Sequence, residues 1–489
     1  MGLPGDGGMP QLQFSFSKRE PNKPQHVNLR LFTVLLICCT VSSYADAEIS
    51  PRLAVNVYSN DNVTLASSGY EQSALIYEVT PGVQMKHDGP SFNALLNYDV
   101  QYLKFEGDVN DSDVNHNFAL NTKSKLYQDA LFLDADATYS QQFIGPDSAI
   151  LLDNLTLSDY VSDVSTVRIS PYLVQSYGSF ASVVYRAGLS RLNYIGQSAS
   201  LNPDSTTRSA EIHAKSGPEF TTFDWNLDLA THKTEPDNQP YSSLRKYTLS
   251  GRDKISSRYY LLGTIGYEDN HYEHSLVDEN LSGTIWSLGA GWQPNRLTNM
   301  EATVGERYFG TIHTFSLNHR TERTQWQIRY LEDVTTTTQL QTDYQTAQPG
   351  SEFLIPVYSQ NVDVIVLKRW SLGTVLHTGK SDLDFHIYDD KRDYQSDDTK
   401  DEIKSALFNW RYRILSRTTM ILSSKAFSQT FRGIDREDNL KAWSLSVERR
   451  IRRKITGQIG YNVIDRTSNV PTAEYLRHVV NAGVKIEFK

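Results

Sequence analysis

The sequence holds only two cysteines in 489 residues, Cys38 and Cys39, and both lie near the N-terminus. The long remainder without cysteine cannot form a disulfide framework. Long apolar runs are also scarce, since the one such run, Leu31–Val41, is shorter than the about 20 residues that a transmembrane helix requires. These absences exclude a disulfide-stapled secreted domain and a helical membrane protein.

The short apolar run has the features of a targeting segment. Basic residues from Lys18 to Arg30 precede it, and the small-residue signature Ala45-Asp46-Ala47 follows it. We therefore expect residues 1–47 to be a secretory signal peptide and residues 48–489 to form one domain outside the cytoplasm. The alternative, a short N-terminal anchor helix, is disfavoured because the run is too short to span a bilayer.

Sequence motifs of catalysis are missing as well. The chain has no G-x-S-x-G, no H-E-x-x-H and no phosphate-binding glycine loop, so we expect neither an enzyme nor a cofactor. His271-Tyr272-Glu273-His274 offers two histidines without a third ligand at a suitable spacing, which argues against a metal site. The formal net charge of −9 disfavours nucleic acid as a partner.

What the chain has in abundance is two-residue alternation. Segments of about 10 to 14 residues switch between apolar and polar side chains, whereas no apolar 3.6-residue period exceeds two turns. In the last segment, Leu476, Val480, Val484 and Phe488 share one face, and Arg477, Asn481 and Lys485 share the other. The same pattern recurs in 92–100, 223–229, 286–293, 406–414 and 455–463.

This pattern is typical of an all-β transmembrane antiparallel up-and-down β-barrel in a bacterial outer membrane, with lipid on one face and the lumen on the other. Short and long connections alternate, as periplasmic turns and outer loops do. Counting segments predicts about 22 strands, within a range of 16 to 22. The irregular stretch 335–360 is too long for a hairpin loop, and we expect it to be a long loop or a partial lumen plug.

Aromatic side chains gather near the ends of these segments, as at Trp286, Trp292, Trp370, Trp410 and Trp443. They predict the interfacial girdles of a membrane barrel in preference to carbohydrate-stacking platforms. Phe488 resembles the terminal aromatic that the barrel-assembly machinery recognises, although Lys489 follows it here. The expected surroundings of the barrel are therefore outer-membrane lipids, lipopolysaccharide and that machinery.

Charged residues on the polar face are the candidate functional residues. They suit two interpretations, which can hold together: charge rows that set ion or solute preference, or a lattice of ion pairs that stiffens the wall. The lumen-lining candidates are Asp99, Arg186, Asp224, Asp228, Arg329, Arg411, Arg413, Glu448 and Arg450.

Three acidic stretches are expected to be solvated outer loops: 107–113, 268–279 and 389–402. The alternative is that their carboxylates bridge to lipopolysaccharide through divalent cations.

Residues 306–335 carry a resemblance to a known family. Arg307-Tyr308-Phe309-Gly310, His319-Arg320-Thr321, Trp326 and Glu332-Asp333-Val334-Thr335 resemble the most distinctive stretch of the PEP-CTERM-system-associated outer-membrane barrels. Pro51-Arg52-Leu53 through Asn60-Asp61-Asn62-Val63, and Lys368-Arg369, also resemble that family. The resemblance implies an outer-membrane role in producing or exporting extracellular polysaccharide, and it brings no catalytic residues.

The hypothesis from sequence is thus a monomeric barrel that passes or binds a polysaccharide, and the alternative is a general porin-like diffusion channel. A TonB-dependent transporter is disfavoured because strand patterning begins within about five residues of the expected cleavage site, which leaves no room for a plug domain. A soluble β-rich adhesin is the remaining rival.

Overall fold

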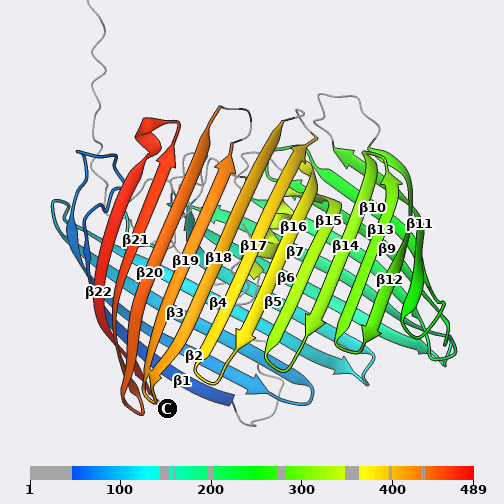
Figure 1. The fold of residues 1–489 in the computed structure, drawn as a ribbon, viewed down its shortest axis with the longest axis horizontal. Coiled ribbons are helices and arrows are strands. Elements are labelled where there is room, and N and C mark those ends of the chain that lie inside the picture. Colours follow the sequence, from blue (N-terminus) through cyan, green and yellow to red (C-terminus); the bar gives the residue numbers. More distant parts are fainter. Residues whose placement is uncertain are drawn as a thin grey trace, which may run out of the picture. The chain divides into compact units, whose positions relative to one another are not determined.

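The computed structural model describes residues 47–143, 153–157, 161–196, 203–272, 281–346, 363–395, 399–431, 433 and 435–488. Twenty-two strands of 10 to 17 residues form a single sheet (Figure 1). The first eleven are β1 (Ala47–Asn60), β2 (Ala74–Asp88), β3 (Phe92–Gly107), β4 (Asp111–Tyr127), β5 (Leu131–Phe143), β6 (Val161–Tyr177), β7 (Ala181–Ile195), β8 (Ser205–Ser216), β9 (Phe223–Pro236), β10 (Ser242–Lys254) and β11 (Tyr259–Tyr272). The others are β12 (Ser282–Asn295), β13 (Thr298–Arg307), β14 (Gly310–Arg320), β15 (Thr324–Thr336), β16 (Val364–His377), β17 (Ser381–Tyr394), β18 (Lys400–Leu415), β19 (Thr418–Thr430), β20 (Glu437–Arg452), β21 (Ile455–Ser468) and β22 (Tyr475–Glu487).

The sheet closes on itself. Each strand pairs antiparallel with the next, and β1 pairs antiparallel with β22 from Arg52 opposite Glu487 to Asn60 opposite Val479. Closure leaves no open edge between the first and last strands, so backbone polar groups of the wall are satisfied within it. The predicted all-β up-and-down barrel with 22 strands is confirmed.

The two ends of the barrel differ in their connections. At one end, neighbouring strands are joined by short turns, such as Lys254 to Tyr259 and Arg452 to Ile455. At the other end the connections are mostly longer, and β15 and β16 are 27 residues apart there. In outer-membrane barrels short turns face the periplasm and long loops face outward, so the long-loop end is the outer end.

A ten-residue helix, α2 (Thr337–Thr346), follows β15 and lies inside the barrel (Figure 1). Its Gln341 and Asp343 contact Gln142 of β5 and Arg168 of β6. Gln142 and Arg168 therefore mark the inner face, and the strand register extends this assignment around the wall because successive side chains alternate between faces.

The outward register positions are apolar and aromatic. Large exposed side chains recur at every second residue, for example Val480 and Val484 of β22, and Ile459 of β21. All seven tryptophans of the sequence occupy outward positions: Trp225, Trp286, Trp292, Trp326, Trp370, Trp410 and Trp443. The described wall thus presents its tryptophans to lipid, as an interfacial girdle does.

Strands run further into the predicted loops than the sequence patterning indicated. The acidic stretch 389–402 is mostly strand, since β17 continues to Tyr394 and β18 begins at Lys400, and Asp390 there is fully buried. The expectation of a solvated loop is therefore wrong for this stretch. His271 and Tyr272, also expected in a loop, end strand β11, and Glu273 and His274 lie outside the described residues.

Other expectations lie partly or wholly beyond the described part. Almost all of the expected signal peptide precedes it, and Ala47 is the first residue of β1. Within the stretch 335–360, residues 335–346 complete β15 and form α2, and the remainder is outside the described residues. Among the helices that the structure describes, none is long and apolar enough to cross a membrane.

Candidate functional site

The nine charged residues predicted to line the lumen all occupy inward register positions, and four of them are paired. Asp99 accepts hydrogen bonds from Arg52 at 2.8 and 2.5 Å. Ion pairs also join Arg186 to Asp134 at 3.1 Å and Asp224 to Lys254 at 3.0 Å. Asp228 pairs with His213. These four belong to a lattice of cross-strand ion pairs.

The other five inward candidates have no side-chain partner among the described residues: Arg329, Arg411, Arg413, Glu448 and Arg450. A charge that faces the lumen without a protein partner is available to a solute. Their role in handling a solute remains a prediction, and so does that of the four paired residues.

The helix α2 begins through a reciprocal pair of hydrogen bonds that sequence reasoning missed. The backbone N–H of Gln339 donates to Thr336 Oγ1 at 3.1 Å, and the backbone N–H of Thr336 donates to Gln339 Oε1 at 3.1 Å. This is a capping box, and the spacing Thr-x-x-Gln is its signature. The helix is polar on all sides, so it carried no apolar period, but the capping box would have predicted where it starts.

Two polar contacts join α2 to the far wall. Gln341 Nε2 donates to Gln142 Oε1 at 2.9 Å, and Arg168 Nη2 donates to Asp343 Oδ1 at 3.2 Å. The helix emerges from β15 yet contacts β5 and β6, which are ten and nine strands away along the sheet, respectively. It therefore bridges the lumen.

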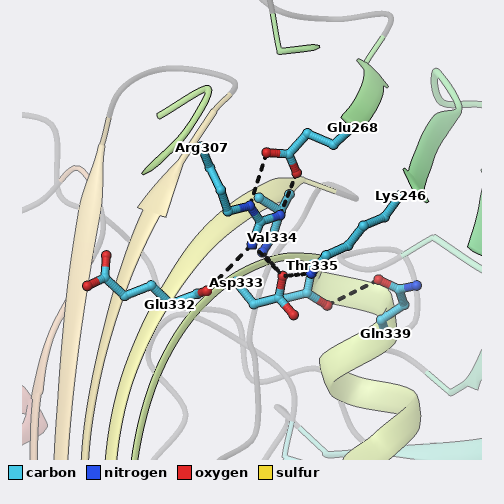
Figure 2. A network of polar contacts seen from close by, with 8 residues as sticks. All are labelled: Lys246, Glu268, Arg307, Glu332, Asp333, Val334, Thr335 and Gln339. Atoms are coloured by element: carbon cyan, nitrogen blue, oxygen red, sulfur yellow. Dashed lines mark hydrogen bonds and ion pairs between the residues drawn. The ribbon is translucent and has the colours of Figure 1, made fainter. Parts of the chain in front are cut away.

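A buried ion-pair network fixes the end of β15 from which α2 departs (Figure 2). Arg307 donates to Glu268 through Nε at 3.0 Å and Nη2 at 2.5 Å, and to Asp333 through Nη1 at 2.7 Å. The Lys246 Nζ donates to the same Asp333 oxygen at 3.1 Å. The side chains of Arg307 and Glu268 are 3% and 1% exposed, so each depends on the other for its charge to be tolerated there.

A second network lies in β16, β17 and β18. Arg369 forms a bidentate ion pair with Asp390, in which Nε donates to Oδ1 at 2.6 Å and Nη2 donates to Oδ2 at 2.5 Å. Arg392 is almost fully buried between Asp390 and Asp401, at 3.7 and 3.8 Å. Asp390, Arg392 and Asp401 come from the stretch that was expected to be a solvated loop. The structure instead uses them to tie three strands together near the outer end.

A second segment, residues 153–157, also lies inside the barrel, against β1 and β22. Arg477 Nη1 donates to Asp153 Oδ1 at 3.0 Å, and Asn60 Nδ2 donates to the Leu155 carbonyl at 2.8 Å. Leu155 is 4% exposed and packs with Val63 and Val479. Burial of such a side chain contributes roughly 1.5–3 kcal/mol, so the contact holds the segment against the wall.

Next to this segment the inner wall borders a cavity of about 640 Å³, which is lined by β16 to β21 and by Asp153. Its central feature is a row of short hydrogen-bonding side chains that are direct lateral neighbours on five strands. We name this row the polar rung; it consists of Asp384, Asn409, Ser423, Ser444 and Asn462.

Two cations flank the polar rung. Arg411 lies two residues from Asn409 along β18, toward the short-turn end, and Lys425 lies two residues from Ser423 along β19, toward the outer end. The carboxylates of the same cavity are engaged: Asp382 with His377 at 2.8 Å, Asp384 with His386 at 2.5 Å, and Asp153 with Arg477. Within the described part of the chain, neither Arg411 nor Lys425 has such a partner.

Carboxylates of the outer connections are held in their charged form. Asp108, between β3 and β4, accepts hydrogen bonds from the backbone N–H and the hydroxyl of Ser73, both at 2.8 Å, and these lower its pKa. The Arg191 guanidinium lowers the pKa of Asp237 between β9 and β10. Both groups stabilise the ends of hairpins, because charged carboxylates accept the stronger hydrogen bonds.

Metal-binding geometry is absent from the described residues, in which no group of three or more His, Cys, Asp or Glu side chains could hold an ion. His271, half of the two-histidine motif, packs against Tyr241 with ring centroids 5.4 Å apart.

Comparison with known proteins places the fold. No family model matches the sequence, and no curated protein matches it either. The FrpB iron transporter from Neisseria meningitidis (F3-3 variant) superposes with a TM-score of 0.52 and 9% sequence identity, covering 91% of this chain and 82% of that one. The apoprotein form of its F5-1 variant gives 0.50 and 10%, over 91% and 82%. The siderophore receptor PirA from Acinetobacter baumannii gives 0.49 and 8%, over 91% and 81%.

At such low identity the likeness to FrpB is one of architecture. It agrees with the closed wall, the apolar outward face and the two unequal ends in describing a barrel of the outer-membrane type. The protein is an outer-membrane β-barrel.

Proposed function

We propose that this protein is an outer-membrane channel for a hydrophilic, hydroxyl-rich solute, and that it serves the production or export of extracellular polysaccharide. The observation that carries the proposal is the polar rung, a row of amide, hydroxyl and carboxylate side chains across five strands of the inner wall. Four of its members make no side-chain hydrogen bond to another described residue: Asn409, Ser423, Ser444 and Asn462.

Unused donors and acceptors facing a cavity suit a solute with many hydroxyl groups. Amide and hydroxyl side chains both donate and accept, so they can replace the water around such a solute with little loss. The resemblance of residues 306–335 to barrels associated with the PEP-CTERM system supports the polysaccharide part of the proposal.

Two features favour a selective channel over a general porin-like one. The helix α2 bridges the lumen through Gln341 and Asp343, and the segment 153–157 lies against the inner wall through Asp153. Segments fixed inside a lumen narrow the pore and add hydrogen-bonding groups to its lining, and both set selectivity. Here they border the route that a solute would take.

Uptake of an iron complex is the second candidate, favoured by the architectural likeness to the FrpB iron transporter. Twenty-two strands are also the number found in outer-membrane transporters with a plugged lumen.

The test is a deletion strain assayed for surface polysaccharide and for growth under iron limitation. Loss of polysaccharide with normal growth supports the proposal. Unchanged polysaccharide with impaired growth supports iron uptake, and large unselective conductance in planar bilayers with neither defect supports a porin.

A further inference from the structure

We propose that the cavity beside the polar rung is a binding site for an acidic oligosaccharide, one whose sugar units carry carboxylates. This inference rests on the proposed function and names the class of its solute. It starts from the pattern of pairing in the cavity, where the carboxylates of Asp153, Asp382 and Asp384 have side-chain partners and the cations Arg411 and Lys425 have none among the described residues.

The lack of a partner for Arg411 is informative because a carboxylate lies directly opposite it on the neighbouring strand. Arg411 lies directly opposite Asp382 across β17 and β18, but the carboxylate of Asp382 contacts His377 instead. A wall built only for rigidity would pair these two charges. Leaving an arginine at the cavity without a carboxylate keeps its planar donor fork for an anion from outside, and this fork matches a carboxylate.

The spacing of the cations fits a chain-like ligand better than a small ion. Arg411 is opposite Ile421 and Lys425 is four residues further along β19, which separates the two positions by roughly 13 Å along the strand. A single inorganic anion cannot bridge this gap. A short oligosaccharide lying along the wall would place one carboxylate near each cation.

Between the two cations lies the polar rung, which would hold the sugar hydroxyls. Asn409 and Ser423 face each other across β18 and β19, and Ser444 and Asn462 continue the row on β20 and β21. The cavity thus offers a cation at each end and a row of hydrogen-bonding groups between them, in which the carboxylate of Asp384 is engaged by His386 and the other four side chains are neutral.

Binding is measured by titration calorimetry on the full-length barrel in detergent. The acidic probe is a linear trisaccharide of galacturonic acid, and the neutral probe is the trisaccharide of galactose. We expect the acidic probe to bind at least tenfold more tightly, and this preference to shrink as salt is raised, because solvent-accessible charges are screened.

Arg411→Gln and Lys425→Gln should each weaken the acidic probe by about tenfold or more, the usual effect of losing a hydrogen bond to a charged group. Neither should change the weak binding of the neutral probe. The matched control is Lys215→Gln, an inward lysine on β8 that does not line the cavity. Asn409→Ala should weaken both probes, since it removes a contact to hydroxyls. Heat-modifiable mobility on gels verifies that every variant is folded.

Equal binding of the two trisaccharides would overturn the inference, and so would inorganic phosphate that competes as strongly as the acidic probe, since this describes a general anion site. Equal losses from Lys215→Gln and Lys425→Gln would also overturn it.

The binding experiment and the deletion strain can fail independently. If the acidic probe does not bind preferentially while the deletion strain lacks polysaccharide, the proposed function still stands. Tight, Arg411-dependent binding with unchanged polysaccharide would refute the proposed function and leave the site.

Discussion

Replacing Arg307 by methionine is expected to destabilise the barrel by about 3–5 kcal/mol, because it leaves the buried carboxylate of Glu268 without its partner. Glu268 is 1% exposed and receives two of its hydrogen bonds from Arg307, at 3.0 and 2.5 Å. Methionine fills similar space without donors, so the loss of packing is small beside the loss of charge pairing. The half-exposed Asp333 keeps its contact with Lys246, so the loss of its contact with Arg307 adds little to this destabilisation.

The matched control is Arg245→Met in β10, the strand that pairs with β11, in which Glu268 lies. Arg245 pairs with Asp269 at 3.2 Å, but both side chains are largely exposed, at 51% and 42%. Exposed pairs contribute about 0–1 kcal/mol, so this variant should unfold close to the parent. The comparison separates burial from the mere presence of an ion pair.

Unfolding in urea, followed by tryptophan fluorescence in lipid vesicles, measures both variants. A second change, Glu268→Gln in the Arg307→Met background, should recover much of the loss, because a neutral amide tolerates the site better than an unpaired carboxylate. If Arg307→Met and Arg245→Met lower the free energy of unfolding by the same amount, burial does not make this pair important and the reasoning fails.

Three further predictions concern the helix, the membrane face and the outer loops. Thr336→Ala removes the cap of α2 at a cost of about 1 kcal/mol, and single-channel recordings should show a larger or noisier conductance, whereas a trace identical to the parent would mean that α2 does not narrow the pore. Leu445→Lys, at an outward position in the middle of β20, should cost about 2–4 kcal/mol of unfolding free energy in lipid, and the inward Ser446→Lys should cost much less; equal costs would contradict the assigned faces. The Asp108 carboxylate should titrate below its ordinary pKa by NMR, and Ser73→Ala should move this pKa part of the way back up, because alanine removes the hydroxyl and keeps the backbone N–H; since the folded value is depressed, the Ser73 contact stabilises the fold above the ordinary pKa and is lost as pH falls through the lowered one. An unchanged Asp108 titration in Ser73→Ala would rule out the hydroxyl as a cause.

The membrane-facing part of the fold could be predicted from sequence because lipid imposes a strict rule at every second position. The faces assigned to 406–414 and 455–463 agree with the register, in which Trp410 and Ile459 point outward and Asn409 and Gln458 point inward. The strand count followed from the same rule. The rule no longer applies where the wall leaves the lipid. For this reason Asp389–Tyr394 was predicted to be a loop, although the backbone continues there as strand.

The inner segments were beyond this rule for two different reasons. The helix α2 contacts the wall through polar side chains, so no apolar stripe marks it, and only its capping box could be recognised in the sequence. The segment 153–157 depends on Arg477, which is 324 residues away in the chain. Alternation fixes which face a side chain takes. It says nothing about which distant side chain it meets across the lumen.

The inward charges of β17 and β18 show why pairing, more than charge itself, separates structure from function in this lumen. Arg392 and Arg411 both lie on the inner face of this strand pair, and each faces an aspartate directly across it, Asp401 and Asp382. Arg392 is buried between two carboxylates and could not be there without them. Arg411 is exposed to the cavity, and its facing carboxylate is directed to His377. The same cross-strand arrangement thus gives a structural ion pair near the outer end and an arginine that is available to a ligand deeper in the lumen. Arg392→Met should therefore lower stability without altering ligand affinity, and Arg411→Gln should do the reverse. If Arg392→Met and Arg411→Gln changed stability and ligand affinity to the same extent, pairing would not separate structural charges from functional ones.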